Sequence, residues 1–178
     1  TVNDILDLAT VDAGIMDLEV DEVHVAVLFA SVEQSFAGRF AEAGVELKTA
    51  VASGITNFKA DGQRLRQVIG NLISNAVNHA PEGSAVNLSA KLDGSDVVMS
   101  IQDEGPGIPS DVLASVFDRF VAHGNGRRRG GAGLGLSIVK GLVELHKGSV
   151  SIQSNAESGT RVDCRFPADP AKFRQAAE

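Results

Sequence analysis

The most informative stretch of the chain reads Asn71-Leu72-Ile73-Ser74-Asn75-Ala76, and two glycine-rich clusters follow it. The first cluster is Asp103-Glu104-Gly105-Pro106-Gly107-Ile108, and the second is Gly131-Ala132-Gly133-Leu134-Gly135-Leu136. The three stretches carry side-chain amides on a helix, a carboxylate before a tight turn, and a glycine-rich helix start whose N–H groups attract phosphate. In this order they predict a site for a nucleotide and its metal ion.

The helix that contains the first stretch has two different faces. Apolar residues form its core stripe, whereas Asn71, Asn75, Asn78 and His79 recur at spacings of three and four and so share the other face. An ordinary solvated face is the alternative interpretation. Each Asn, however, costs roughly 0.6 kcal/mol of helix propensity relative to Ala, so three on one stripe favour a functional role.

Composition limits the class of protein. The chain has 178 residues, of which 43% are hydrophobic, so we expect one domain with a short appendage. Its net charge of −7 argues against a nucleic-acid partner, which requires a basic surface. The single cysteine, Cys164, rules out an internal disulfide framework, and its alternation with Val162 and Phe166 predicts a buried thiol. No apolar run approaches the ~20 residues that span a bilayer, so we expect a soluble piece.

Apolar periodicity and turn residues predict an α+β two-layer sandwich, in which helices cover one face of a mixed, mostly antiparallel sheet. The motif Gly-x-Gly-x-x-Gly and the Gly-Lys-Ser/Thr P-loop are both absent, which excludes the two commonest phosphate-binding folds. The predicted helices cover residues 1–13, 24–43, 61–80, 109–117 and 134–146. The predicted strands cover residues 15–23, 45–51, 84–92, 96–103, 149–155 and 160–166, with a hairpin turn at Asp93-Gly94.

In the three opening stretches the chain resembles the catalytic, ATP-binding domain of sensor histidine kinases. This domain belongs to the ATPase superfamily that includes gyrase B subunits and the MutL mismatch-repair proteins. The resemblance covers about residues 14–166. It implies that residues 1–13 end the second dimerisation helix, that residues 14–167 form the catalytic ATP-binding domain, and that residues 168–178 are a C-terminal tail.

The resemblance also implies a role for individual residues. Asn75 would ligate Mg²⁺ through its side-chain oxygen, and Asp103 would accept a hydrogen bond from the exocyclic amino group of adenine. Asn71 and His79 would face the nucleotide, and Thr160 would lie near the phosphates. The full ATP-binding set that the resemblance implies is Asn71, Asn75, His79, Asp103, Gly105, Gly107, Ile108, Phe120, Gly131, Gly133, Leu134, Gly135, Leu136 and Thr160.

The chain departs from the family pattern in three places. Asn78 stands where a basic residue is usual, Glu104 replaces an Asn, and Val121-Ala122 replaces an aromatic and basic pair. Residues 121–132 are glycine-rich and contain three consecutive arginines. We expect this segment to act as a lid that is mobile without nucleotide and closes when phosphate is bound.

The implied reaction is transfer of the γ-phosphoryl group of Mg-ATP to a histidine on a dimerisation helix. None of the four histidines lies in a His-Glu acceptor box, so we expect the acceptor outside this chain. In hydrolysing relatives a Glu activates water at the position of Asn71, and an amide is a poor base, so the site suits transfer rather than hydrolysis.

The resemblance further implies a set of partners and a location. The expected partners are ATP, the protein's own dimerisation and histidine phosphotransfer domain, and a response regulator receiver domain. The full protein would be a homodimer in the cytoplasm, with membrane anchoring left open, and this fragment a monomer. The alternatives are a non-catalytic nucleotide-sensing module of a degenerate kinase, an anti-sigma-type serine kinase and an ATP-independent interaction domain.

Overall fold

The structure, a computed structural model, describes residues 6, 9–11, 14–118 and 134–168. Its helices are α2 (Val25–Ala43), α3 (Gly62–His79), α4 (Ser110–Leu113) and α5 (Gly135–Leu145). Its strands are β1 (Asp21–His24), β2 (Glu46–Val51), β3 (Asn57–Ala60), β4 (Ala85–Asp93), β5 (Asp96–Asp103), β6 (Ser149–Asn155) and β7 (Gly159–Pro167).

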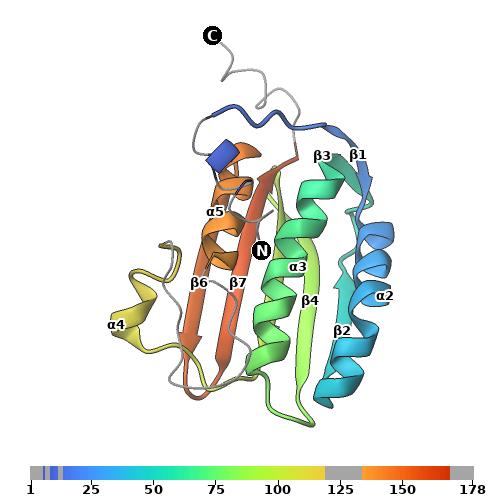
Figure 1. The fold of residues 1–178 in the computed structure, drawn as a ribbon. Coiled ribbons are helices and arrows are strands. Elements are labelled where there is room, and N and C mark those ends of the chain that lie inside the picture. The colour runs from blue at the N-terminus through green and yellow to red at the C-terminus, as the bar shows by residue number, and fades with distance from the viewer. Residues whose placement is uncertain (1–5, 7–8, 12–13, 119–133, 169–178) are drawn as a thin grey trace.

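The molecule has two layers, as the sequence predicts. Five strands form one sheet in the order β2-β4-β5-β7-β6, and β1 pairs with β3 in a separate two-stranded sheet. The pair β2–β4 is parallel, and the other neighbours in the large sheet are antiparallel. Helices α2, α3 and α5 lie side by side over one face of this sheet (Figure 1). The fold is therefore the predicted α+β sandwich with a mixed, mostly antiparallel sheet.

Helix α3 runs along the middle of the helix layer and carries much of the core. Its N-cap is Asp61, whose side chain accepts hydrogen bonds from the backbone N–H groups of Gln63 and Arg64. Leu65 and Ile73, on the side that faces the sheet, are fully buried. Burying one such aliphatic side chain contributes about 1.5–3 kcal/mol, so this apolar stripe fixes α3 on the sheet.

The N-terminal end of α3 is joined to the end of α5 by buried hydrogen bonds. The backbone N–H of Asp61 donates to Nε2 of His146 (3.1 Å), and Nδ1 of His146 lies 2.8 Å from the Leu142 carbonyl oxygen. The His146 ring is completely buried and packs edge-on against Phe166 of β7. Burial lowers the pKa of His146, so the neutral ring is favoured.

Three local predictions need correction, and one strand was missed. Residues 15–23 were expected to form a strand, but only Asp21–His24 pairs. Its partner β3 was missed, because Asn57–Ala60 has too few residues to show an alternating pattern. The hairpin is confirmed, but its two turn residues are Gly94 and Ser95, since Asp93 still pairs with Asp96. The helix expected over 109–117 ends at Leu113 and continues only as turns.

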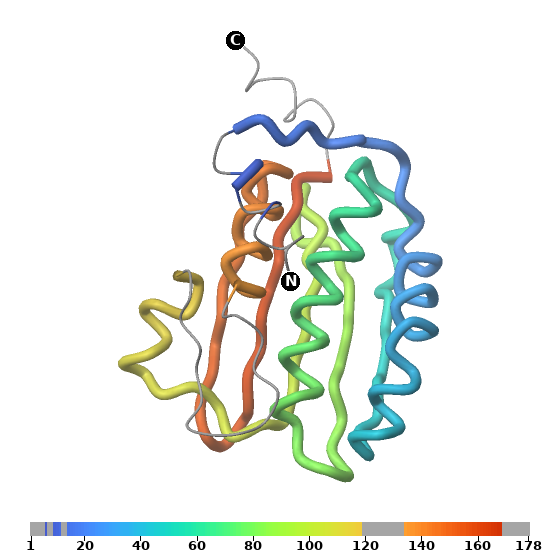
Figure 2. Tube along the Cα trace, in the orientation of Figure 1, coloured from blue at the N-terminus to red at the C-terminus, as the bar shows by residue number. Residues whose placement is uncertain are grey.

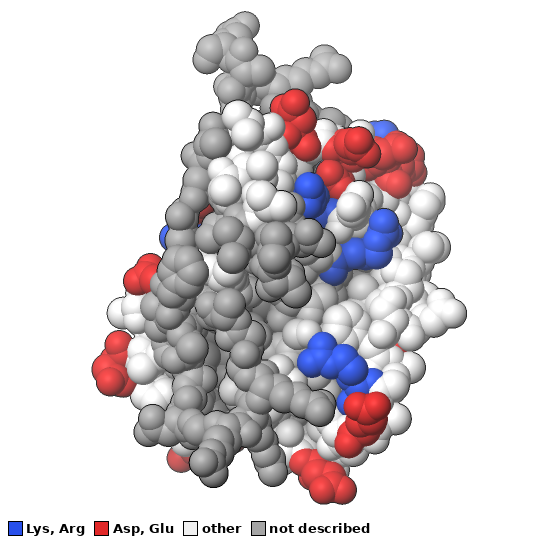
Figure 3. Space-filling model, viewed as in Figure 1, with Lys and Arg blue, Asp and Glu red and all other residues white. Residues whose placement is uncertain are grey.

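Charged side chains are distributed unevenly over the helix-covered face. Lys and Arg side chains form two separate groups over α2 and α3, whereas acidic side chains gather near β1 and at the opposite end (Figure 3). The thiol of Cys164 is buried, as predicted, and burial raises its pKa to about 12. Among the helices of the described residues, none has both the length and the apolar character needed to cross a membrane.

Candidate functional site

Several of the predicted site residues meet at one end of the molecule. There β5 ends at Asp103, α3 ends at His79, and β6 turns into β7 between Asn155 and Gly159. The segment that leads from β5 to α4 runs past the end of α3 and past the β6–β7 hairpin (Figure 2). The fold therefore brings together residues that are up to 81 positions apart in the sequence, since His79 and Thr160 both lie near Asp103.

Asp103 is a buried carboxylate, with 7% of its surface exposed. Its Oδ1 accepts a hydrogen bond from the backbone N–H of Gly105 (2.8 Å). Burial raises the pKa of Asp103, whereas backbone hydrogen bonds from Gly105 and Thr160 and the nearby His79 oppose that shift. The carboxyl group is thus held in a fixed orientation, where it can accept a further N–H bond from a ligand.

The turn after Asp103 is packed so tightly that it requires glycine. Gly107 has a φ of 75°, and a Cβ at this residue would collide with the carbonyl oxygen of Asn155. A Cβ on Gly105 would lie 2.7 Å from Asp103 Oδ1 and 3.0 Å from the His79 carbonyl oxygen. The resemblance to the kinase family implies that both glycines belong to the ATP-binding set. The structure shows that they also let the turn pack between α3 and the β6–β7 hairpin.

Asn71 and Asn75 lie on the partly buried side of α3. The Nδ2 atom of Asn71 is buried and has no hydrogen-bond partner among the described residues. A buried donor left without a partner costs about 1–3 kcal/mol, which marks it as a group that a ligand can satisfy. Asn75 faces the start of α5, because a Cβ on Gly135 would lie 3.9 Å from Asn75 Nδ2.

Asn78 and His79 end the polar face and point to different neighbours. Asn78 Oδ1 accepts a hydrogen bond from Arg39 Nη2 (3.1 Å) on α2, and Arg39 Nη1 donates to Ser74 Oγ (2.5 Å). His79 is exposed and lies near Asp103. The side chain of Asn78 is therefore engaged by α2.

Helix α5 begins beside Asn75, and no side chain among the described residues caps its first N–H groups. Leu134 is buried at the N-cap position and provides no side-chain cap, and the first turn contains no acidic residue. Ser137 Oγ donates to the Leu134 carbonyl oxygen (2.8 Å), and Leu136 is partly buried. A helix start of this kind attracts an anion through its free N–H groups and its dipole.

Thr160 and Ile108 are linked by a residue that the sequence did not suggest. Ser154 Oγ accepts a hydrogen bond from the Ile108 N–H (2.8 Å) and lies 2.7 Å from Thr160 Oγ1. Thr160 is also the register partner of Asp103 across β5 and β7. Ser154 was missed because it is one of several polar residues in the β6 segment, and its contacts depend on pairing between distant segments.

Part of the predicted set lies outside the described residues. Phe120, Gly131 and Gly133 fall there, as does the predicted lid, residues 121–132. Most of the predicted dimerisation helix at 1–13 and the tail from residue 169 onward also fall outside.

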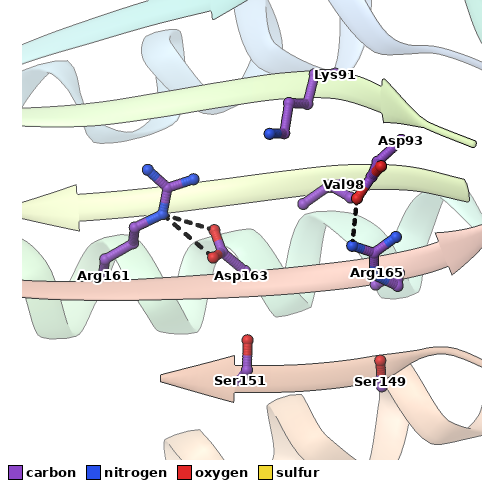
Figure 4. Close-up of a pocket in the computed structure, with 8 residues that line it drawn as sticks. All are labelled: Lys91, Asp93, Val98, Ser149, Ser151, Arg161, Asp163 and Arg165. Atoms are coloured by element: carbon purple, nitrogen blue, oxygen red, sulfur yellow. Dashed lines mark hydrogen bonds and ion pairs between the residues drawn. The ribbon is translucent and has the colours of Figure 1, made fainter. Parts of the chain in front are cut away.

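Apart from this site, a cavity of about 120 Å³ lies on the face of the sheet that the helices do not cover (Figure 4). Four of its charged groups are paired: Arg161 Nε lies 2.9 Å from Asp163 Oδ1, and Arg165 Nη2 lies 2.6 Å from Asp93 Oδ2. These pairs largely neutralise each other, and Lys91 adds one further positive charge to the lining. The residues that line it are Lys91, Asp93, Val98, Ser149, Ser151, Arg161, Asp163 and Arg165.

Comparison with known proteins gives one family. Residues 60–170 match the model of the histidine kinase-, DNA gyrase B- and HSP90-like ATPases. The chain is 38% identical over 167 residues to the sensor protein DivL of Caulobacter vibrioides, covering 94% of this chain and 21% of DivL. The chain therefore spans only about a fifth of this curated relative.

Solved structures agree with the family match. Full-length ShkA in complex with AMPPNP superposes with a TM-score of 0.82 at 34% identity, covering 93% of this chain and 35% of that chain. The nucleotide-free catalytic domain of the histidine kinase ThkA superposes with a TM-score of 0.76 at 24% identity, covering 86% of this chain and 100% of that domain. At that identity the ThkA match supports the fold alone.

Proposed function

The chain belongs to the family of histidine kinase-, DNA gyrase B- and HSP90-like ATPases, as the ATP-binding catalytic domain of a sensor histidine kinase, and from this premise we propose its mode of action. It binds Mg-ATP at the end of the molecule where α3, the β5–α4 turn and the start of α5 meet. In the whole protein it transfers the γ-phosphoryl group to a histidine on a separate dimerisation helix.

The observation that carries this proposal is the placement of three kinds of group around one end of α3. A buried and oriented carboxylate, Asp103, lies beyond the last turn of the helix. Asn71 and Asn75 lie within the helix, and the uncapped start of α5 lies beside Asn75. These groups suit a base with an exocyclic amino group, a hard cation and a phosphate chain, respectively.

The described residues fit magnesium and ATP. Asn75 offers the oxygen ligand that Mg²⁺ prefers, and Mg²⁺ commonly takes few ligands from protein. Asn71 Nδ2 is a buried donor with no partner among the described residues, and a phosphate oxygen would satisfy it. Once bound, Mg²⁺ would neutralise part of the phosphate charge.

Each residue would then have a separate task. Asp103 would accept the amino N–H of adenine, and guanine would be disfavoured because it presents a carbonyl oxygen at that place. The first N–H groups of α5 would bind phosphate oxygens. Asn71 would orient the phosphates without activating water, because an amide is a poor base at neutral pH. The arrangement therefore favours holding ATP for transfer over hydrolysing it.

Calorimetric titration of the 178-residue chain with Mg-ATP, Mg-ADP and Mg-GTP tests the binding step. We expect micromolar to submillimolar affinity for ATP, a comparable value for ADP and much weaker binding of GTP. Equal binding of ATP and GTP would contradict the role of Asp103. The transfer step is tested by mixing the chain with the dimerisation domain of the same protein and following phosphate from labelled ATP to histidine.

The metal assignment is tested by Asn75→Ala. We expect this variant to melt near the wild type, because Asn75 is only partly buried, and to bind ATP with little dependence on Mg²⁺. Asn78→Ala on the same helix is the matched control, because its side chain contacts Arg39 instead. Normal magnesium-dependent binding by Asn75→Ala would show that another residue holds the ion.

A further inference from the structure

We propose that Ser154 is a positioning residue for base recognition. Its hydroxyl ties the turn after Asp103 to the β6–β7 hairpin and thereby holds the Asp103 carboxylate in place for the amino group of adenine. The inference rests on the proposed function, because it concerns how the same site selects its base.

The first argument is the number of contacts that converge on one hydroxyl. Ser154 Oγ accepts from the Ile108 N–H at 2.8 Å and lies 2.7 Å from Thr160 Oγ1. It also donates to the Gly159 carbonyl oxygen at 3.2 Å. A serine hydroxyl has one donor and two acceptor positions, so these contacts use its full capacity. The β5–α4 turn and the β6–β7 hairpin therefore share a single hydrogen-bonding centre.

The second argument is the position of Asp103 between the two segments that Ser154 joins. Oδ1 of Asp103 accepts the N–H of Gly105, which belongs to the same turn as Ile108. Thr160, which Ser154 also contacts, is the register partner of Asp103 across β5 and β7. The turn that orients this carboxyl group and the strand beside it are thus the two segments that Ser154 joins.

The third argument is that the turn and the hairpin are in direct backbone contact at Asp103, so that a shift of either segment would reach this residue. A Cβ on Gly107 would collide with the Asn155 carbonyl oxygen, and one on Gly159 would collide with the Asp103 carbonyl oxygen. Backbone therefore packs directly on backbone here. The Ser154 hydroxyl provides the side-chain link from the hairpin to the Ile108 N–H.

The test uses three serine variants of the whole chain. Ser154→Ala removes the hydroxyl, and Ser154→Thr retains it. Ser151→Ala is the matched control, because Ser151 lies on the same strand, exposed, and lines the cavity on the opposite face of the sheet. The measurements are ATP affinity by calorimetry, the melting temperature, and the NMR hydrogen exchange of the Gly105 amide.

We expect Ser154→Ala to lose about five- to tenfold in ATP affinity, in line with one hydrogen bond of about 1–1.5 kcal/mol. The Gly105 amide should exchange faster, because its acceptor is less well fixed. Ser154→Thr should restore both properties, and Ser151→Ala should leave both unchanged.

Two results would overturn the inference. One is a Ser154→Ala protein with wild-type ATP affinity. The other is a loss of affinity that Ser154→Thr does not restore, because side-chain shape rather than the hydroxyl would then be responsible. Failure of the wild type to bind ATP would instead refute the proposed function, so the two failures are distinguishable.

Discussion

A buried aspartate lies at each end of α3: Asp61 is its N-cap, and Asp103 is the last residue of β5. The two aspartates have different surroundings. At the first end, Asp61 accepts backbone N–H groups from Glu19, Gln63 and Arg64, and its own N–H donates to His146. At the other end, Asp103 accepts from the turn that follows it, and burial raises its pKa. Asn71, at the middle of the same helix, retains a buried donor with no partner among the described residues.

Residues at the first end of α3 therefore contribute to stability, and residues toward its second end contribute to ligand binding. The first end meets the general requirement that buried polar groups be hydrogen-bonded, and so it fixes α3 against α5 and the chain before β1. The C-terminal half of the helix departs from that requirement at Asn71, whose buried donor a nucleotide would satisfy. Changes at the first end should therefore alter the free energy of unfolding, and changes at the second end should alter affinity.

The largest effect should come from Asp61→Ala. The substitution leaves the N–H groups of Glu19, Gln63 and Arg64 without their acceptor, so we expect a loss of about 2–4 kcal/mol in the free energy of unfolding. Urea unfolding measures this change. Asp61→Asn keeps one acceptor oxygen and should lose less. A loss below about 1 kcal/mol in Asp61→Ala would break the contrast between the two ends.

Asp103→Asn should have the opposite effect, with a large loss of ATP affinity and a small change in the free energy of unfolding. We expect at least a tenfold loss of ATP affinity, from a charged hydrogen bond worth about 1.5–3 kcal/mol. The free energy of unfolding should change by less than about 1 kcal/mol, because burial already disfavours the ionised carboxylate. Calorimetry and urea unfolding on the same protein separate the two quantities. A variant that loses stability but keeps its affinity would show that Asp103 is structural.

Local signals in the sequence predicted most of the fold. The predicted start of α3 near residue 61, the predicted end of α2 at residue 43 and the hairpin near Gly94 are all present, because each depends on a few adjacent residues. The pairing of β1 with β3 and the parallel pairing of β2 with β4 were not predicted. Partner choice depends on packing between segments far apart in the chain, which a local pattern does not record.

In the site, too, features within one short motif were predicted, whereas contacts between distant segments were not. Asp103, Gly105 and Gly107 lie in one continuous motif, and the structure brings them near His79 and Thr160. The links made by Ser154 were missed, because they join β6 to a turn 46 residues earlier. The Arg39–Asn78 bond was missed for a similar reason, since it joins two helices whose relative placement is set by the core.

Asn71→Leu should sharpen the comparison, because it should raise the free energy of unfolding and lower the ATP affinity. Removing a buried donor without a partner should raise the free energy of unfolding by about 1 kcal/mol in the absence of nucleotide. ATP affinity should fall, because the phosphates lose a donor. Asn78→Leu is the matched control, and it should lower neither the free energy of unfolding nor the ATP affinity by more than a small amount. A less stable Asn71→Leu protein would mean that the amide already has a partner.

The smallest effect concerns pH and the first end of α3. Because burial lowers the pKa of His146, the unfolded chain binds a proton more readily than the folded chain. The free energy of unfolding should therefore be highest above the ordinary histidine pKa of about 6.5 and fall as the pH drops from there toward the folded pKa. The Leu142 hydrogen bond and the charge of Asp61 oppose the shift, so the decline should be modest.

The physical reason is that Nε2 of neutral His146 accepts the Asp61 N–H, and a protonated ring would lose this bond inside the core. Urea unfolding between pH 7.5 and 5.5 should show the decline in the wild type and in His24→Gln, in which an exposed histidine is removed. The decline should be reduced in His146→Phe, whatever the absolute stability of that variant. NMR titration of the wild-type ring is an independent measurement, because a His146 that titrates at or above the ordinary value would contradict the assignment. In that case the first end of α3 would tolerate a charged group, and the contrast with the nucleotide end would rest on Asp61 alone.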